Sequence, residues 1–429
     1  MKKIIDFVSK HPVVVTALVC VVFYFLPFKP KPFGDGQFHS GTQELIQFIL
    51  NGFQGNVHID KGFLTLFCYL IPYSLVYSFH NDHLFYLSSV VFSCAFVCYS
   101  VYLIFKTLDI MEFDVKTKFI ALIILSIFPI HIYYAMGVIG EVFAFFAVSV
   151  FVFTWVKITK LKTDSLMSYV YLALSLVLLY GIKPTMIPFI FAFTVCLLFF
   201  KVKLVNKIVF TFIIFLIPIL GMIEKNMDNS GFDFKSTIFR NQILWSRFEL
   251  RDEPFNWLPQ HGRDGFESSD YLNNLAKREE LDSICNVDKL DKTNYFVHWV
   301  VNDIVENPLL TLRQYSLKFF QSQSFIISPL MKSNKSNLVK WGIHIYINSI
   351  NYLLVLVSIW SMYILFKRKE YQLFIPFLMF WGWSLVYVFV FHSEQRYMFP
   401  ARPILIVLFA YGFNEYLIGR SLYKDYTVN

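Results

Sequence analysis

The chain has 429 residues, a mass of 50.5 kDa and a formal net charge of +8. Hydrophobic residues make up 56% and charged residues 16% of it, and the mean hydropathy is +0.53. Soluble domains carry about 45–50% apolar and about 25% charged residues. The composition therefore excludes a disordered chain, a collagen-like rod and a small disulfide-bonded secreted protein. It indicates an all-α polytopic membrane protein.

Apolar stretches long enough to cross a membrane recur along the chain. A spanning helix needs about 20 mostly apolar residues, and the sequence predicts about ten transmembrane helices. A further apolar stretch, Phe63–Phe79, contains Pro72 and is expected to lie in the membrane interface. The predicted spans cover residues 11–28, 83–105, 118–135, 142–156, 166–181, 185–200, 208–223, 346–366, 371–391 and 401–418.

Basic residues decide the orientation, because Lys and Arg near span ends collect on the cytoplasmic side. With a cytoplasmic N-terminus, ten spans place every basic cluster at a short turn inside, and the C-terminus as well. If Phe63–Phe79 crossed the membrane, the Lys106–Lys118 turn would face outward, so the interfacial position is favoured. The net positive charge is then explained by topology and anionic lipid heads, and nucleic acid binding has no support.

Three parts follow from these spans. Residues 1–223 are expected to form a transmembrane core, in which the outer loop 29–82 carries interfacial helices. Residues 224–345 are expected to form a small, mostly helical extracytoplasmic domain, with helices at Asp270–Asp282 and after Asn307-Pro308. Residues 346–429 supply the C-terminal spans and a cytoplasmic tail.

The first outer loop carries two groups of ionisable residues. Asp35 lies between two glycines directly after the first span, where it is either a functional carboxylate or part of a simple turn. His58, Asp60 and Lys61 cluster before the interfacial stretch. A Lys beside an acid suits phosphate binding, but an interfacial ion pair that anchors the helix is an equal alternative.

Two further outer turns carry charge. Glu141 opens the fourth span, where an ionisable group is a functional candidate, or a helix N-terminal charge favoured by the macrodipole. The turn between the last two spans holds His392, Glu394, Arg396 and Tyr397. Arg396 and Lys183 depart from the positive-inside rule, which indicates an anionic partner, although Glu394 offers Arg396 an ion pair.

These residues resemble the motifs of C-type glycosyltransferases that use polyprenyl-phosphate sugars, a superfamily that includes protein O-mannosyltransferases and lipid A aminoarabinose transferases. Gly34-Asp35-Gly36 and Gly140-Glu141 are similar to the two acidic motifs of that family. Asp60-Lys61-Gly62-Phe63 resembles its acid-Lys-Pro-Pro stretch, with Gly and Phe in place of the prolines. Gln395-Arg396-Tyr397, with Pro400 and Pro403, resembles its Arg-Tyr motif.

The resemblance implies an inverting transfer of a sugar from undecaprenyl phosphate to a glycan or lipid acceptor, such as O-antigen, on the outer side of a bacterial inner membrane. It implies Asp35 as the base, with Glu141 at the catalytic centre. It also implies that Lys61, Arg396 and Lys183 hold the donor phosphate. Supporting roles would fall to His58, Asp60, His392, Glu394 and Tyr397, and His261 and Arg263 would shape the acceptor site. No cluster demands a metal, and a divalent ion stays open.

Two other classes of function stay open. An O-antigen polymerase or ligase is also many-spanned, but such proteins rely on arginines in large outer loops. A transporter or flippase for lipid-linked glycans predicts ionisable residues deep within spans, and the predicted span centres are nearly free of charge. No nucleotide-binding loop of the Walker type is present in the sequence.

Overall fold

The structure is a computed structural model of residues 1–429, and every element in its described part is helical. The residues it describes are 7–26, 36–55, 57, 62–76, 79, 81–127, 130–163, 165–227, 239–251, 269–325, 330, 334–390 and 398–426. Backbone contacts divide the chain into two units. Unit 1 comprises Met1–Asn229, Ile350–Trp381 and Phe399–Asn429, and unit 2 comprises Ser230–Ser349 and Gly382–Met398.

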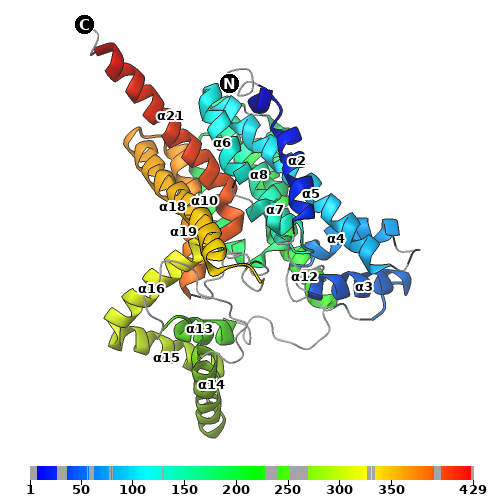
Figure 1. The fold of residues 1–429 in the computed structure, drawn as a ribbon. Helices are drawn as coiled ribbons and strands as arrows, with labels where there is room; N and C mark the ends of the chain where they lie inside the picture. The colour runs from blue at the N-terminus through cyan, green and yellow to red at the C-terminus, as the bar shows by residue number, and fades with distance from the viewer. Residues whose placement is uncertain are drawn as a thin grey trace. The chain divides into compact units, whose positions relative to one another are not determined.

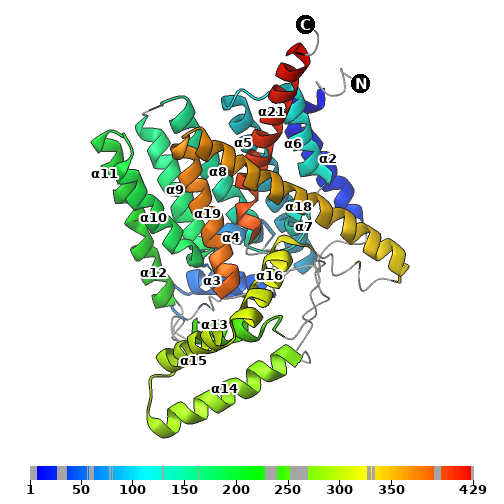
Figure 2. The same cartoon turned by 90° about the vertical axis from the view of Figure 1, so that its left-hand side faces the viewer.

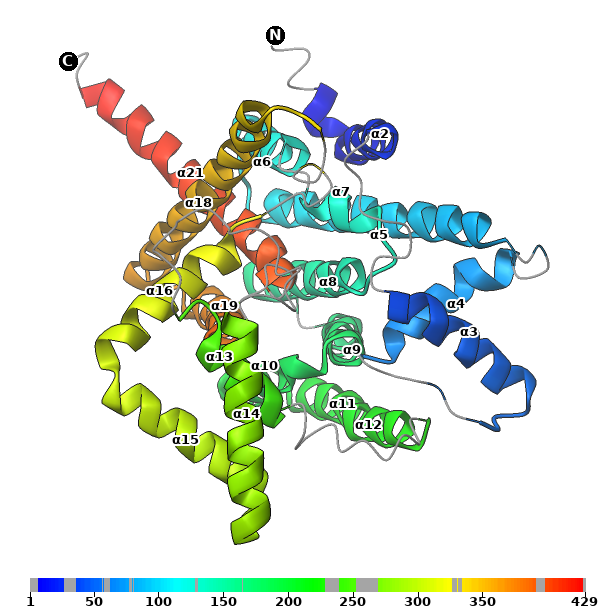
Figure 3. The same ribbon diagram turned by 60° about the horizontal axis from the view of Figure 1, so that its bottom comes forward.

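Unit 1 contains a row of packed helices. Helix α8 packs between α5 and α9, and α11 packs on the other side of α9 (Figures 1 and 3). Helix α2 lies against α5, and α21 contacts α5, α6 and α8. The elements are α2 (Pro12–Phe25), α3 (Gly36–Leu50), α4 (Leu64–Val76), α5 (Asp82–Ile110), α6 (Val115–Ile127), α7 (Ile130–Ala135), α8 (Glu141–Lys160), α9 (Leu166–Ile182), η2 (Pro184–Met186), α10 (Ile187–Phe199), α11 (Leu204–Ile214), α12 (Leu216–Met227), η4 (Phe399–Ala401) and α21 (Arg402–Tyr426).

Helix α8 is the centre of this unit. Within its most apolar stretch, 72% of the residues are buried, against 17% in the stretch Leu204–Ile223 at the edge of the row. Trp155 of α8 donates a hydrogen bond to the carbonyl of Gln372, at 2.7 Å, and packs edge-on against Phe193. Helix α8 is thus surrounded by protein, whereas α11 and α12 leave much of their apolar surface exposed. The row therefore has a buried central helix and an apolar outer surface.

A lipid environment explains why this outer surface is apolar. Large apolar side chains stay exposed along the outer helices, among them Phe25 at 78%, Phe199 at 83% and Phe212 at 74%. Large exposed apolar patches are rare on soluble monomers. Among the residues that the structure describes, five helical stretches are long and apolar enough to cross a membrane: Asp82–Ile110, Glu141–Lys160, Leu204–Ile223, Asn337–Lys367 and Tyr371–Val390.

Each predicted span coincides with at least one described helix. Several of these helices are short, however. Residues 118–135 divide into α6 and the six-residue α7, and the apolar helices Pro12–Phe25, Leu166–Ile182 and Pro184–Phe199 have fewer than 18 residues. Helix α4 has 13 residues with Pro72 inside it, which is short for a crossing helix. The all-helical fold is confirmed, and the count of about ten spans stays a prediction.

The ends of the spans follow from local sequence. Asn81 caps α5, and its side-chain oxygen accepts the backbone N–H groups of His83 and Leu84 at 2.9 and 3.2 Å. Lys157 and Lys160 occupy the last turn of α8, where the helix dipole favours cations. Lys160 also lies 2.6 Å from Glu370, in the turn between the two long C-terminal helices. The basic turns are thus partly paired with acids.

Unit 2 is a helical unit with its own core. Its elements are α13 (Phe239–Phe248), α14 (Ser269–Asp288), α15 (Lys292–Glu306) and α16 (Pro308–Gln323), together with parts of the long helices α18 (Asn337–Lys367) and α19 (Tyr371–Val390) (Figure 2). Helix α13 packs on both α14 and α15. Leu244, Leu281, Cys285 and Phe296 form the centre of an apolar cluster between them.

A buried polar network fixes the residues after α13. Gln314 donates hydrogen bonds to the carbonyls of Ser246, Arg247 and Glu249, at 2.7–3.2 Å. Lys318, with no exposed surface, donates to the carbonyl of Ser246 at 2.6 Å and lies 3.7 Å from the Glu249 carboxylate. These bonds satisfy carbonyls at the end of α13 that no helical partner can reach.

Asp303 completes that network from α15. Its carboxylate is paired with both Arg247 and Arg251, the latter at 2.9 Å, and it accepts a hydrogen bond from Asn307 at 3.0 Å. Burial raises the pKa of Tyr315, a neighbour on α16, and the charge of Arg247 opposes this shift.

Helix α16 therefore buries a polar face. The sequence predicts an apolar face formed by Leu309, Leu312, Tyr315, Leu317 and Phe320. Of these, Leu317 is buried, whereas Leu309 and Leu312 are 81% and 67% exposed. Gln314 and Lys318 point inward instead, because their long side chains reach the backbone carbonyls at the end of α13.

Candidate functional site

Glu141 is the first residue of α8 and directly follows a tight turn. Gly140 precedes it as the N-cap, and the carboxylate occupies the first turn, where the helix dipole favours negative charge. The residue is only 7% exposed. A carboxylate buried this deeply requires a charged or hydrogen-bonding partner.

The partner is Lys183, at the C-terminal end of α9. Its Nζ lies 3.5 Å from Glu141 Oε1, and both side chains are about nine-tenths buried, at 10% and 9% exposure. Lys183 is held there because its backbone N–H still bonds to Leu179, at 2.8 Å, while Pro184 stops the helix at the next residue. The two charges therefore meet at the ends of neighbouring apolar helices.

Two tyrosines fix the turn before Glu141. The hydroxyl of Tyr69, from α4, donates to the carbonyl of Ile139 at 2.9 Å and accepts its N–H at 2.8 Å. The hydroxyl of Tyr86, from α5, donates to the carbonyl of Met136 at 2.8 Å. The backbone that positions the carboxylate is thus tied to two other helices.

Glycines bring the start of α4 against this site. A Cβ atom at Gly62 would lie 2.3 Å from the carbonyl oxygen of Ile182 and 2.4 Å from that of Gly181. A Cβ at Gly140 would lie 2.8 Å from Thr65 Oγ1. These backbones approach more closely than any side chain allows. Residue 62 is therefore in contact with the end of α9, directly before Lys183.

A second buried polar group lies in the same unit. Arg402, the first residue of α21, is 8% exposed and donates a hydrogen bond to Asn351 Oδ1 at 2.7 Å. Among the described residues, the buried side-chain nitrogen of Asn351 and the buried Nε2 of His131 have no hydrogen-bond partner. Buried polar atoms without partners are uncommon in folded proteins and require an explanation.

Aromatic contacts connect the two polar groups. Phe145 lies one helical turn after Glu141 on α8. Its ring stacks on that of His131, with centroids 5.9 Å apart, and on that of Phe399, at 5.2 Å. Phe399 precedes Arg402 by three residues. Sequence reasoning missed this second group, although Arg402 adjoins the predicted outer turn and, like Lys183, departs from the positive-inside rule in the predicted topology.

The structure thus brings Glu141 and Lys183 together. The other predicted site residues lie outside the described residues: Asp35, His58, Asp60, Lys61, His261, Arg263, His392, Glu394, Arg396 and Tyr397. Within the described part, no group of three or more His, Cys, Asp or Glu side chains is arranged to hold a metal ion. Among these residues the acid at the site is Glu141, and its ion-pair partner is Lys183.

No protein-family model matches the chain, and no curated protein matches it in sequence.

Proposed function

We propose that the chain is an inverting membrane glycosyltransferase that moves a sugar from a polyprenyl phosphate to a cell-envelope glycan or lipid. The observation that carries the proposal is the buried Glu141–Lys183 pair at the ends of two apolar helices. Removing a carboxylate and a lysine from water costs free energy that their attraction only partly offsets. Ionisable groups at the ends of membrane spans are therefore candidates for a functional role.

The described neighbours of the other motifs support the same location. Gly62, which follows Lys61 in the sequence, contacts the end of α9 beside Lys183. Phe399, which follows Arg396 and Tyr397, stacks on Phe145 one turn after Glu141. Segments that are distant in the sequence and that flank three of the four motifs therefore meet at the start of α8.

The proposed chemistry divides the charges by role. Asp35 removes the proton from the acceptor hydroxyl, and the oxygen attacks the anomeric carbon as its bond to the phosphate oxygen breaks. Lys61, Lys183 and Arg396 neutralise the leaving phosphate. We add Arg402, with the side-chain NH₂ group of Asn351, as a further group for that phosphate, because both are buried beside one another. Glu141 holds Lys183 in position.

The proposed topology places this site outside the cytoplasmic membrane of a bacterium. About ten spans, with both termini in the cytoplasm and α3 and α4 in the interface, keep the basic turns inside. Glu141 and Lys183 then face the outer side, where a flipped lipid-linked donor is accessible.

The test is sugar transfer in proteoliposomes that contain the purified full chain and lipid-linked sugars prepared from labelled nucleotide sugars. We expect label to move from polyprenyl phosphate to an envelope glycan acceptor, and Asp35→Asn and Glu141→Gln to stop the transfer. Movement of the donor between leaflets with no new glycosidic bond would identify a transporter. Polymerisation from a diphosphate-linked donor would identify a polymerase. Either result would overturn the proposal.

A further inference from the structure

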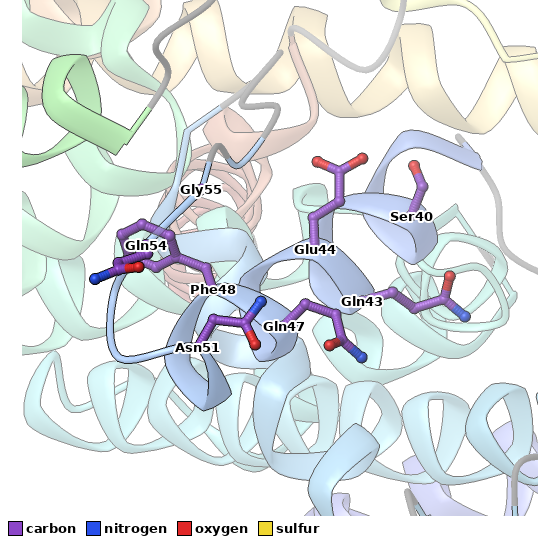
Figure 4. Close-up of a pocket in the computed structure, with 8 residues that line it drawn as sticks. All are labelled: Ser40, Gln43, Glu44, Gln47, Phe48, Asn51, Gln54 and Gly55. Carbon is purple, nitrogen blue, oxygen red and sulfur yellow. The ribbon is translucent and has the colours of Figure 1, made fainter.

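Helix α3 carries a groove, lined mainly by residues with polar side chains, that the proposed chemistry does not use. The groove runs along α3 and the turn that follows it, with a cavity volume of 290 Å³ (Figure 4). This is near the lower end of the range of small-molecule pockets, ~300–1,000 Å³. Its side chains include four amides, one carboxylate and one aromatic ring, from Gln43, Gln47, Asn51, Gln54, Glu44 and Phe48.

The amides form a regular series. Gln43, Gln47 and Asn51 are four residues apart, which places them on one face of a helix about 6 Å from one another along its axis. Asn51 continues the helical turn, because its N–H bonds to the carbonyl of Gln47 at 2.9 Å. After it, Gly52 and Phe53 adopt φ values of +67° and +66°, which turn the chain so that Gln54 also lines the groove.

The lining chemistry selects one class of ligand. An amide both donates and accepts hydrogen bonds, and so does a hydroxyl group. The lining residues, all of them described, include no Lys or Arg that could balance the charge of a phosphate or an acidic sugar. Phe48 offers a half-buried apolar surface for the C–H groups of a sugar ring.

We propose that this groove binds a neutral saccharide segment of the acceptor. The inference rests on the proposed function, because α3 begins at Gly36, the residue after the proposed base Asp35. A saccharide bound along the amide series would lead toward the start of α3. The groove thereby assigns the acceptor to neutral, hydroxyl-rich glycans.

The experiment measures saccharide binding without any donor. Purified full-length protein is titrated with fluorescent neutral oligosaccharides, namely linear glucan, mannan, galactan and N-acetylglucosamine oligomers, with an oligogalacturonate as the acidic comparison. We expect at least one neutral oligomer to bind and the acidic one not to bind. Gln47→Ala/Asn51→Ala should weaken binding at least tenfold, since two hydrogen bonds at about 1 kcal/mol each exceed the 1.4 kcal/mol of a tenfold change.

The control is Gln372→Ala, which removes an exposed amide at the start of α19 and should bind as the unaltered protein does. Failure of every neutral oligomer to bind, or equal binding by the double variant, would overturn the inference. The transfer assay separates this result from the proposed function. If the unaltered protein transfers no sugar but the saccharide still binds in the groove, the transferase proposal fails alone. If transfer occurs with an unchanged acceptor KM in the double variant, the groove proposal fails alone.

Discussion

Lys183 Nζ lies 3.5 Å from Glu141 Oε1, although Glu141 begins α8 and Lys183 follows the last residue of α9. Both side chains are about nine-tenths buried. Attraction between two such charges offsets the cost of removing them from water only while both are present. This makes the pair sensitive to the loss of either partner.

Removal of one charge should therefore destabilise the protein. We expect Glu141→Gln to lower the free energy of unfolding by about 3–5 kcal/mol, because it removes a carboxylate that pairs with the buried Lys183. Thermal unfolding in detergent measures this effect. In Glu141→Gln/Lys183→Met both charges are gone, so the stability should recover while sugar transfer does not. Recovered transfer in the double variant would show that the pair has only a structural role.

The close approach at Gly62 predicts a strong effect of a single methyl group. Gly62→Ala should destabilise the contact between α4 and α9, because its Cβ would lie 2.3 Å from a backbone oxygen that cannot move aside. The matched control is Gly342→Ala on α18, where a Cβ meets nothing within 4 Å and where alanine favours the helix by about 1 kcal/mol. Thermal unfolding should move in opposite directions for the two variants, and equal shifts would contradict the observed packing.

The hydroxyl of Tyr69 should matter for position more than for folding. Tyr69→Phe leaves both groups of Ile139 without their partner, at a cost of about 1–3 kcal/mol. We expect a lower kcat for sugar transfer, because the turn before Glu141 loosens. Tyr171→Phe, at a tyrosine that is 53% exposed, is the control and should leave kcat unchanged. An unchanged kcat in Tyr69→Phe would remove this turn from the catalytic argument.

The membrane position of α4 can be decided with two cysteines. In a variant without the native cysteines, Gln54→Cys and Val115→Cys introduce thiols at exposed positions on either side of α4 and α5. If α4 lies in the interface, an impermeant reagent labels Gln54→Cys from outside and Val115→Cys only after permeabilisation. Labelling of both from the same side would show that α4 crosses.

The polar network of unit 2 should be structural. Arg247→Met leaves Asp303 with Arg251 as its remaining arginine partner and removes the hydrogen bond to Gln314, so we expect a loss of about 3–5 kcal/mol. Lys277→Ala breaks a pair with the largely exposed Glu280 and should cost at most about 1 kcal/mol. Chemical denaturation compares the two, and equal losses would contradict the role assigned to burial.

Local composition was sufficient for the helices. The expected span 166–181 corresponds to α9 (Leu166–Ile182), and 371–391 corresponds to α19 (Tyr371–Val390). Helix α3 (Gly36–Leu50) is one of the helices expected within the loop 29–82. Such segments are predictable because a run of apolar residues, or an apolar periodicity, and its Pro, Gly or charged boundaries lie within a few turns of one another.

The polar contacts were not predictable in the same way. Glu141 and Lys183 were each notable in the sequence, but their pairing was not expected, and Arg402 with Asn351 and His131 was missed. The polar inward face of α16 also went against its apolar pattern, because Lys318 and Gln314 bond to carbonyls on another helix.

By itself the sequence determined an apolar, all-helical chain in which the few charged residues lie mainly outside the apolar stretches. Only the tertiary structure decided which charges share a site, which helix is buried at the centre and which polar side chains turn inward. The physical reason is that helix formation depends on neighbouring residues. Ion pairs, glycine contacts and buried hydrogen bonds depend instead on how distant helices pack, and this packing brings Glu141 to Lys183 and Gly62 to Gly181.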